Sequence, residues 1–399
     1  MNRIYMDNAA TTRVSPAVVE KMGLVLQEVF GNPSSIYEEA RQAKQLLEES
    51  RAVVAGALNC KPQEIFFTSG GTEADNWAVK GAFEKNGSKG HLITTTIEHH
   101  AVLHVAEHLE KKFGCEVTYL PVDENGLISL EALEEAIRPD TFLISIMMGN
   151  NEIGTIQPVR EIGELARKHK VLFHTDAVQT FGKLPLDMAD LHVDMLSVSA
   201  HKIHGPKGVG CLYVRRGTNL PAMMHGGAQE RGKRPGTENT ASIAGFAQAV
   251  RDSLEDREAK NRKLLELTDR LIEGVSETIP HVRLNGHREK RVPGNVNFSF
   301  EFVEGESLLL MLEQQGVSAS SGSACTSGSL DPSHVLLAIG LPHEIAHGSL
   351  RLSLDSEENT MEDVETLIRV LPPILERLRS MSPLYDDYVR QCRKGESDV

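Results

Sequence analysis

The chain has 399 residues, too many for one ordinary hydrophobic core, so we expect two domains. Its 42 basic and 56 acidic side chains give a formal net charge of −14, which argues against a direct nucleic-acid binder, because such a protein needs a basic face. No apolar run is long enough for a membrane span, and the N-terminus has no signal-peptide pattern. The five cysteines are scattered without a C-x-x-C pair, which predicts a cytoplasmic protein without structural disulfides.

Up to about residue 215 the sequence alternates short β-rich runs with amphipathic helical stretches. Strands are predicted at residues 64–69, 91–96, 116–122, 141–148, 171–176, 194–199 and 209–216. Strands alternating with helices predict a mostly parallel sheet that is covered on both faces. Ligands bind beyond the carboxyl ends of the strands in such sheets, so we expect the polar residues that follow these strands to converge on one site.

The second half of the chain has a different pattern. A glycine-rich basic segment at 225–239 precedes a helical stretch from about residue 240 to 279. Strands at 294–303 and 348–354, a helix at 305–316 and a C-terminal helical stretch at 361–381 predict a smaller α/β domain. Pro372 and Pro373 should break or kink that last helix. We predict a large domain of residues 15–259 and a small domain of residues 1–14 and 260–399.

Lys202 follows the predicted strand at 194–199 in the segment "SVSAHKIHGPKG". A lysine in a glycine-rich loop is usually a solvated surface charge, and Lys207, after the turn, fits that description. Lys202 instead lies directly at the strand end, between Ser199 and His201 on one side and a Gly-Pro turn on the other. A partly desolvated lysine can form a Schiff base, so Lys202 is a candidate catalytic residue.

Two other strand ends suit a phosphorylated cofactor. Gly71 and Thr72 in "TSGGTEADN" lie between a strand and a helix, where backbone N–H groups can bind a phosphate. Asp176 and Gln179 in "HTDAVQ" follow another strand, and an acid that faces a pyridinium nitrogen is the partner expected of pyridoxal phosphate. Taken singly, a tight turn and a helix N-cap explain the same residues.

His100, His104 and His108 are spaced as zinc ligands on one helical face can be, and "HVAEH" fits a short zinc-protease pattern. Patterns of this length arise by chance, and the helix is otherwise an ordinary amphipathic one. We therefore expect no permanent metal site. His99, at the strand end, is the histidine that we place in the active site.

Cys325 lies in the serine- and glycine-rich stretch "SSGSACTSGS". A free cysteine is usually a small buried hydrophobe, which suits Cys60, Cys115 and Cys211. A Ser/Gly-rich loop is flexible, so it suits a thiol that reacts at one position and passes its product on at another. Arg351 in "SLRLSL" lies opposite the leucines of its strand, either on a solvated face or as a bidentate ligand of a substrate carboxylate.

Together these segments resemble the successive motifs of pyridoxal-phosphate-dependent cysteine desulfurases, a group within the class-V aminotransferases. The motifs are "YMDNAATT", "GNPSS", "FTSGGTEADN", "EHHAV", "GNNEIGTIQP", "HTDAVQ", "SAHKIHGPKG", "GTEN" and "SSGSACTSG". The similarity runs from Tyr5 to about Ser382, and the longer cysteine loop resembles the NifS/IscS group rather than the SufS-like group. It implies the fold of the fold type I pyridoxal-phosphate-dependent transferases, like aspartate aminotransferase, with a large and a small α/β domain.

The resemblance also implies a role for each candidate residue. Lys202 would hold the cofactor as a Schiff base and move the substrate's Cα proton, His99 would stack on the cofactor ring and carry protons, and Cys325 would accept the sulfur. The cofactor would be bound by Gly71, Thr72, His99, Asn151, Asp176, Gln179, Ser199, His201, Lys202 and Thr237. Thr237 would reach the phosphate from the partner subunit of a homodimer, and Asn151 and Arg351 would bind the substrate carboxylate.

The implied reaction converts L-cysteine to L-alanine and leaves a persulfide on Cys325, for an iron–sulfur scaffold protein or another sulfur acceptor. Cys325 could also contact a transient iron–sulfur cluster. Two alternatives stay open. A selenocysteine lyase or another fold type I pyridoxal enzyme uses Lys202 but does not need Cys325. A non-enzymatic metal or thiol carrier uses the histidines and cysteines without a cofactor.

Overall fold

The computed structural model describes residues 3–321 and 332–395. Its largest sheet has the strand order β2-β8-β7-β6-β5-β3-β4. The strands are β2 Ile65–Thr68, β3 His91–Thr95, β4 Glu116–Leu120, β5 Thr141–Ser145, β6 Leu172–Asp176, β7 Met195–Ser199 and β8 Gly210–Val214. β8 is antiparallel to β2 and β7, and the pairs among β7, β6, β5, β3 and β4 are parallel. The predicted mostly parallel sheet is therefore confirmed.

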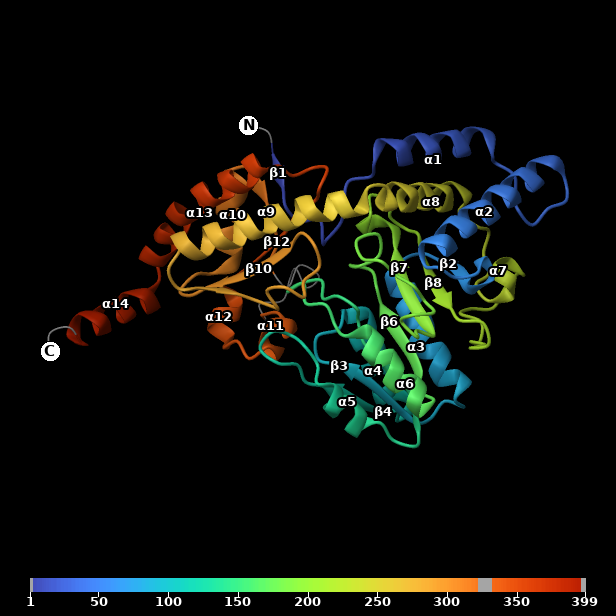
Figure 1. The fold of residues 1–399 in the computed structure, drawn as a ribbon, viewed down its shortest axis with the longest axis horizontal. Helices are drawn as coiled ribbons and strands as arrows, with labels where there is room; N and C mark the ends of the chain where they lie inside the picture. Colours follow the sequence, from blue (N-terminus) through green and yellow to red (C-terminus); the bar gives the residue numbers. More distant parts are fainter. Residues whose placement is uncertain (1–2, 322–331, 396–399) are drawn as a thin grey trace.

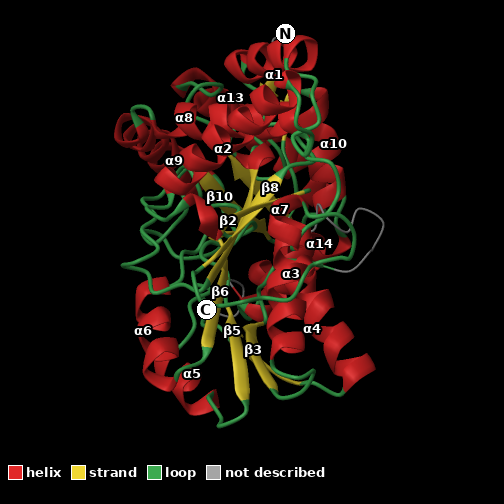
Figure 2. Cartoon of the chain, turned by 90° about the vertical axis from the view of Figure 1, so that its right-hand side faces the viewer, coloured by secondary structure: helices red, strands yellow, loops and turns green. Residues whose placement is uncertain are grey.

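Helices cover both faces of this sheet (Figure 2). α3 (Gly71–Lys85) and α4 (His100–Phe113) lie on one face, and α5 (Leu130–Ala136) and α6 (Val159–His169) lie on the other. Every residue of β3, β5 and β7 is buried, so both faces of these strands are covered, and none of the three strands contains an Asp, Glu, Lys or Arg residue. α1 (Pro16–Glu28), α2 (Glu38–Ala57) and α8 (Thr240–Leu254) pack together beyond one end of the sheet (Figure 1).

A second unit has its own apolar core, which includes Leu271, Phe298, Phe300 and Leu371. Its antiparallel sheet has the order β12-β10-β9, formed by β9 Val282–Leu284, β10 Asn295–Phe300 and β12 Ser349–Ser353. β1 (Ile4–Tyr5) pairs in parallel with β11 (Val317–Ser318), so the N-terminus belongs to this unit. α9 (Arg257–Thr278), α10 (Gly305–Gln314) and α13 (Met361–Ser380) cover the unit, and α9 runs toward α8 along one side of the molecule (Figure 1).

The structure refines two helix predictions. The stretch at 240–279 is not one helix, because Asp256 adopts a left-handed backbone with φ of 50° and separates α8 from α9. α13 is not broken at Pro372 and Pro373, since the neighbouring Leu371 and Ile374 are buried in the core of the second unit and hold the helix together.

Short elements complete the described chain. They are the 3₁₀ turns η1 (Pro62–Glu64) and η2 (Ala200–Lys202), and the helices α7 (Gln229–Gly232), α11 (His334–Ala338), α12 (His343–His347) and α14 (Pro383–Gly395). Of the helices in the described ranges, none combines the length and the apolarity needed to cross a bilayer. The predicted domain boundaries at residues 15 and 259 stay a prediction.

Candidate active site

A cavity of about 370 Å³ lies beyond the carboxyl ends of the central strands. It is lined by Ala9, Ala10, Gly71, Thr72, Asp75, His99, Met147, Asn151, Asp176, Val178, Gln179, Ser199, His201, Lys202 and Arg351. Ten of the twelve predicted site residues are therefore brought together, from both units of the chain. Thr237 lies elsewhere, and Cys325 lies outside the described residues.

Lys202 ends the 3₁₀ turn η2 directly after β7. Its Nζ donates hydrogen bonds to the carbonyl oxygens of Ala9 at 2.6 Å and Ala10 at 2.7 Å. Gln179 Nε2 donates to the same Ala9 carbonyl at 3.0 Å. The N-terminal segment thus forms one wall of the cavity, a role that the sequence analysis did not assign to it although it lies in the motif "YMDNAATT".

Asp176 ends β6, and burial raises its pKa to about 6, although the hydrogen bond from the Val178 N–H at 2.8 Å and the charge of Lys202 act in the opposite direction. Asp75, which was not predicted, lines the same cavity, and burial together with the charge of Asp176 raises its pKa well above the usual range. Within the described chain, Asp75 Oδ1 is a buried atom without a hydrogen-bond partner. Such a concentration of buried carboxyl groups fits a cationic ring nitrogen beside Asp176.

His99 is the N-cap residue of α4, and its Nδ1 accepts a hydrogen bond from the Ala101 N–H at 3.1 Å. Burial lowers the pKa of His99 to about 4, and the charge of Lys202 adds to this effect. The imidazole is therefore neutral at neutral pH, and with Nδ1 accepting, its proton must lie on Nε2. A neutral ring of this kind suits both stacking and proton transfer.

The part of the cavity lining formed by Gly71, Thr72 and His201 has the features of a phosphate site. α3 begins at Gly71, and its N-cap residue Gly70 has no side chain to occupy the free N–H groups of the first turn. A Cβ on Gly71 would lie 2.8 Å from Val178 Cγ2, so a side chain would crowd this cradle. Burial, and then the charge of Lys202, lowers the pKa of His201 to about 4, and its Nδ1 lies 3.2 Å from Thr11 Oγ1.

Arg351 is only 2% exposed on β12, which excludes the solvated-face interpretation of this residue. Its guanidinium donates to the Asn151 carbonyl oxygen at 3.1 Å and to Asp7 Oδ1 at 2.8 Å. In the part of the chain that the structure describes, the buried Nε has no hydrogen-bond partner. Arg351 is therefore held in place, and its remaining N–H groups, that of Nε among them, are left for a ligand such as a carboxylate.

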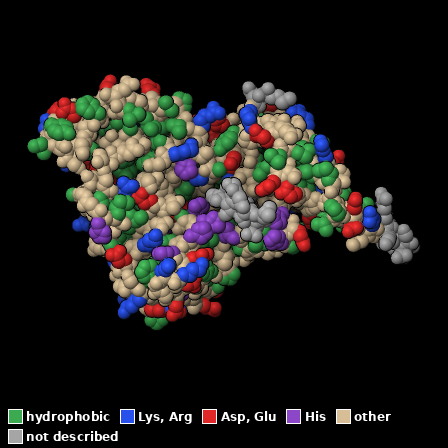
Figure 3. Space-filling view, turned by 180° about the vertical axis from the view of Figure 1, so that it is seen from behind, with side chains coloured by type: hydrophobic (Ala, Val, Ile, Leu, Met, Phe, Trp, Pro, Cys, Tyr) green, Lys and Arg blue, Asp and Glu red, His purple; other side chains and the backbone are tan. Residues whose placement is uncertain are grey.

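A group of histidines lies next to His99, on the face shown in Figure 3. The rings of His104 and His334 each lie 4.8 Å from the ring of His100, measured between centroids. His334 was not a sequence candidate, and it joins the group because its Nε2 lies 3.0 Å from the carbonyl oxygen of Glu98. Among the described residues, no group of three or more His, Cys, Asp or Glu side chains is arranged to hold a metal ion.

The comparisons with known proteins decide the family. The family model described as aminotransferase class-V matches residues 4–367. A curated relative from Clostridium botulinum, named cysteine desulfurase IscS, is 53% identical over 98% of this chain and 99% of its own length. A solved NifS-like protein superposes with a TM-score of 0.87 at 40% identity and covers 94% of this chain and 99% of its own. Another, described as SspA in complex with cysteine, has a TM-score of 0.79 at 40% identity, with coverage of 88% and 99%.

This chain belongs to the cysteine desulfurase branch of the class-V aminotransferases. The predicted family, fold class and enzymatic character are confirmed, and the alternative of a non-enzymatic carrier is set aside. Enzymes of this family depend on pyridoxal phosphate, so the cofactor prediction is confirmed as well.

The cavity of this class-V aminotransferase fits pyridoxal phosphate at both ends. The first turn of α3 with Thr72, Ser199 and His201 would hold the phosphate, and Asp176 would face the ring nitrogen. Lys202 lines the same cavity and would hold the cofactor as a Schiff base.

Proposed function

We propose that this enzyme removes the sulfur from L-cysteine, releases L-alanine and retains the sulfur as a persulfide on Cys325. The observation that carries the proposal is the convergence of Lys202, Asp176 and Arg351 in one cavity, since these are the groups for proton transfer, for a cationic ring and for a substrate carboxylate. The cysteine bound to a relative of 40% identity supports the choice of substrate.

The substrate carboxylate binds Arg351, which is held from two sides by Asn151 and Asp7. This arrangement fixes the guanidinium before the substrate arrives, so little side-chain entropy is lost on binding. The amino acid is thereby oriented with its Cα toward Lys202. Asn151 contributes through the same contact.

Lys202 transfers the proton at Cα. Its Nζ is held by the carbonyl oxygens of Ala9 and Ala10 inside the cavity, in position to take the proton from a bound substrate. Pyridoxal phosphate supplies the electron sink for the bond electrons released at Cα. His99, neutral with its proton on Nε2, can carry a proton between Lys202 and the leaving sulfur.

The sulfur step requires the thiol of Cys325, which lies outside the described residues. Its thiolate attacks the substrate sulfur, the Cβ–S bond breaks, and the bond electrons remain with the carbon skeleton, which is protonated to alanine. No external oxidant or reductant is consumed. Support comes from Ser320, five positions before Cys325 in the sequence, whose N–H donates to the carbonyl oxygen of the cavity residue Arg351 at 3.2 Å.

We also propose a homodimer in which Thr237 serves the partner's site. Thr237 is exposed and lines a separate groove with Arg234 and Glu238, so its own cavity does not use it. Leu26, Phe30 and Ile36 are 68%, 73% and 89% exposed, and large apolar side chains grouped in this way favour burial against a second copy. The final sulfur acceptor would be an iron–sulfur scaffold protein or another thiol acceptor, and the enzyme would act in the cytoplasm.

The experiment is a comparison of Cys325→Ala with Cys392→Ala, which removes an exposed cysteine. The Cys325 variant should bind cofactor and cysteine but release no alanine at a useful rate, whereas the Cys392 variant should match the parent. Given cysteine without reductant, the parent's Cys325 peptide should gain the mass of one sulfur atom. Alanine release at the parental rate from Cys325→Ala would contradict the proposed sulfur transfer and would favour a lyase of the selenocysteine type.

A further inference from the structure

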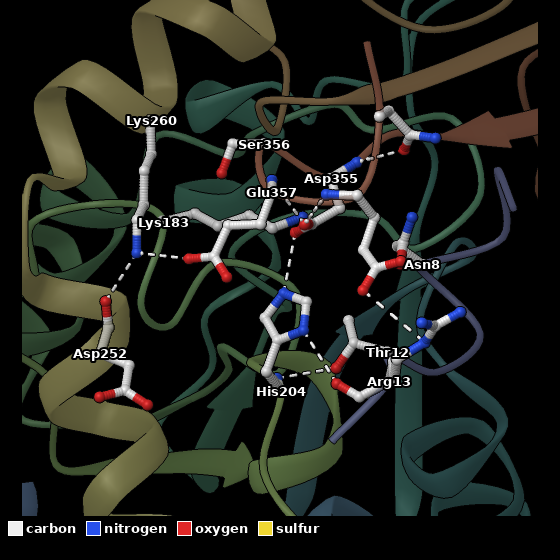
Figure 4. Close-up of polar contacts among 12 residues, drawn as sticks. Asn8, Thr12, Arg13, Lys183, His204, Asp252, Lys260, Asp355, Ser356 and Glu357 are labelled. Atoms are coloured by element: carbon white, nitrogen blue, oxygen red, sulfur yellow. Dashed lines mark hydrogen bonds and ion pairs between the residues drawn. The ribbon is translucent and has the colours of Figure 1, made fainter. Parts of the chain in front are cut away.

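His204 lies two residues after Lys202, and both of its ring nitrogens face hydrogen-bond acceptors (Figure 4). Nδ1 lies 2.9 Å from the carbonyl oxygen of Arg13, and Nε2 lies 2.9 Å from Asp355 Oδ2. A carbonyl oxygen and an ionised carboxylate accept hydrogen bonds but cannot donate them. Both ring nitrogens must therefore carry a hydrogen, which is the imidazolium form.

Asp355 is built to stay ionised. Its Oδ1 accepts from the backbone N–H groups of Glu357 at 2.9 Å and Glu358 at 3.1 Å. Burial opposes ionisation, but the hydrogen bond and charge of His204 lower the pKa of Asp355 to about 2. In return, Asp355, the Arg13 carbonyl and the charge of Glu357 raise the pKa of His204, although burial acts against this.

Other charged groups around the pair come from several elements. Glu357 pairs with Lys260 of α9 at 2.9 Å (Figure 4). Glu358 lies 3.7 Å from Arg13 of the N-terminal segment. Lys183 lies nearby (Figure 4), and burial lowers its pKa while the charge of Asp355 acts in the opposite direction. The lysines and the acids largely compensate one another, so His204 and Asp355 form the central ion pair of the group.

The contacts of His204 join three segments that are distant in the sequence. Its backbone N–H donates to Thr12 Oγ1 at 2.7 Å, which ties the Lys202 turn to the N-terminal segment. That segment supplies the Ala9 and Ala10 carbonyl oxygens that accept from Lys202. Asp355 follows β12, the strand of Arg351. His204 itself has φ of 63°, and a left-handed histidine persists only where its surroundings hold it.

We propose that His204 is a positioning residue, whose imidazolium ties the Lys202 turn to the N-terminal segment and to β12 and so fixes Lys202 relative to Arg351. The inference rests on the roles proposed above for Lys202 and Arg351. When His204 loses a proton, one of its two ring contacts loses its hydrogen. The geometry between the base and the carboxylate site then relaxes at alkaline pH.

The protonation state is tested directly by ¹⁵N NMR of the holoenzyme labelled at histidine, with His204→Gln used to assign the signals. Both nitrogens of His204 should be protonated at pH 7, and its titration midpoint should lie above the ordinary value of 6.5. Asp355→Asn should move that midpoint to lower pH. A wild-type His204 with an unprotonated ring nitrogen at pH 7 would overturn the proposal.

The consequence for the reaction is tested by pH profiles of cysteine turnover. His204→Gln can donate to only one of the two acceptors in this geometry, and it should lower kcat/KM by about tenfold, as the loss of one hydrogen bond to a charged group does. It should also remove the alkaline decline, while Asp355→Asn should shift that decline to lower pH. Arg13→Ala keeps the backbone carbonyl and should behave as the parent.

Unchanged kinetics and pH profile in a folded His204→Gln variant would overturn the positioning role. If that variant does not fold, the shift in Asp355→Asn decides in its place, because the amide keeps the size of the carboxylate while removing its charge. The NMR result does not depend on which substrate the enzyme converts. Failure of the proposed function would appear instead as cysteine turnover that does not require Lys202 or Cys325.

Discussion

Buried carboxyl groups lie in two regions of this molecule. One is the cavity, with Asp75 and Asp176, and the other is the junction around His204, with Asp355. In the cavity, burial raises the pKa of Asp176 to about 6, and burial together with the charge of Asp176 raises that of Asp75 well above its usual range. At the junction, Asp355 is also largely buried, yet His204 lowers its pKa to about 2. The comparison shows that burial alone does not set the charge of an acid. At the junction the protein itself supplies the cation, which is His204. The carboxyl groups of the cavity instead suit a cationic ring of the cofactor.

The largest effect should follow from Lys202→Ala, which removes the side-chain amine of Lys202 from the cavity. We expect turnover to fall by at least about 10³-fold, because both covalent cofactor binding and proton transfer are lost. The absorbance of the lysine-bound cofactor should disappear as well. Lys207 is exposed after the same turn, and Lys207→Ala should keep both properties. Retained absorbance in the Lys202 variant would refute the assignment.

Asp176→Asn in the cavity should have opposite effects on turnover and on stability. The loaded enzyme should bind cofactor but turn over about 10²- to 10³-fold more slowly, since the carboxylate no longer stabilises the cationic ring. The cofactor-free variant should be more stable than the parent at pH 8. The folded-state pKa is raised from 3.8 to about 6, so ionising Asp176 above pH 6 costs stability that the amide does not lose. Urea unfolding of the cofactor-free proteins and steady-state kinetics measure the two effects, and a variant that is less stable at pH 8 would contradict this account.

Asp355→Asn should have the opposite effect on stability at the junction. The folded-state pKa of Asp355 is lowered from 3.8 to about 2, so its contribution is present above about pH 4 and is lost as the pH falls toward 2. We expect a loss of about 2 kcal/mol at pH 7, from a shift of nearly two pKa units. Urea unfolding at pH 7 and at pH 3 should show the difference shrinking in acid. Asp269→Asn, at a half-exposed ion pair, should change stability little at either pH.

The smallest effect should come from His201→Gln at the phosphate end. His201 is neutral at pH 7 because burial and Lys202 lower its pKa to about 4, so the variant removes a hydrogen bond but no charge. Cofactor affinity should fall about tenfold, in keeping with one lost hydrogen bond to a charged group. Fluorescence titration of the cofactor-free protein measures this, with the exposed His108→Gln as the control. Equal affinities for the two variants would argue against a phosphate role for His201.

Sequence patterns predicted the sheet and most of the cavity because both depend on local signals. The strands of the large sheet are short β-rich runs, most of them next to helical stretches, and the carboxyl ends of parallel strands meet at one edge. Asp176 ends its strand, and Lys202 and His99 come shortly after theirs, so their convergence could be expected before any tertiary contact was known. The glycine pair at the start of α3 is a signal of the same local kind.

The remaining features depend on contacts between distant parts of the chain. Asp7 and Arg351 are 344 residues apart, and His204 and Asp355 are 151 apart, so no periodicity or spacing relates them. Asp75 lies inside a helix pattern, and only the packing of α3 against the strand ends brings it to Asp176. Whether a buried acid is charged depends on the partner that the fold places beside it. The two units pack around the N-terminal segment and bring Thr12, His204 and Asp355 together. This tertiary packing therefore determines which partner lies beside the acid.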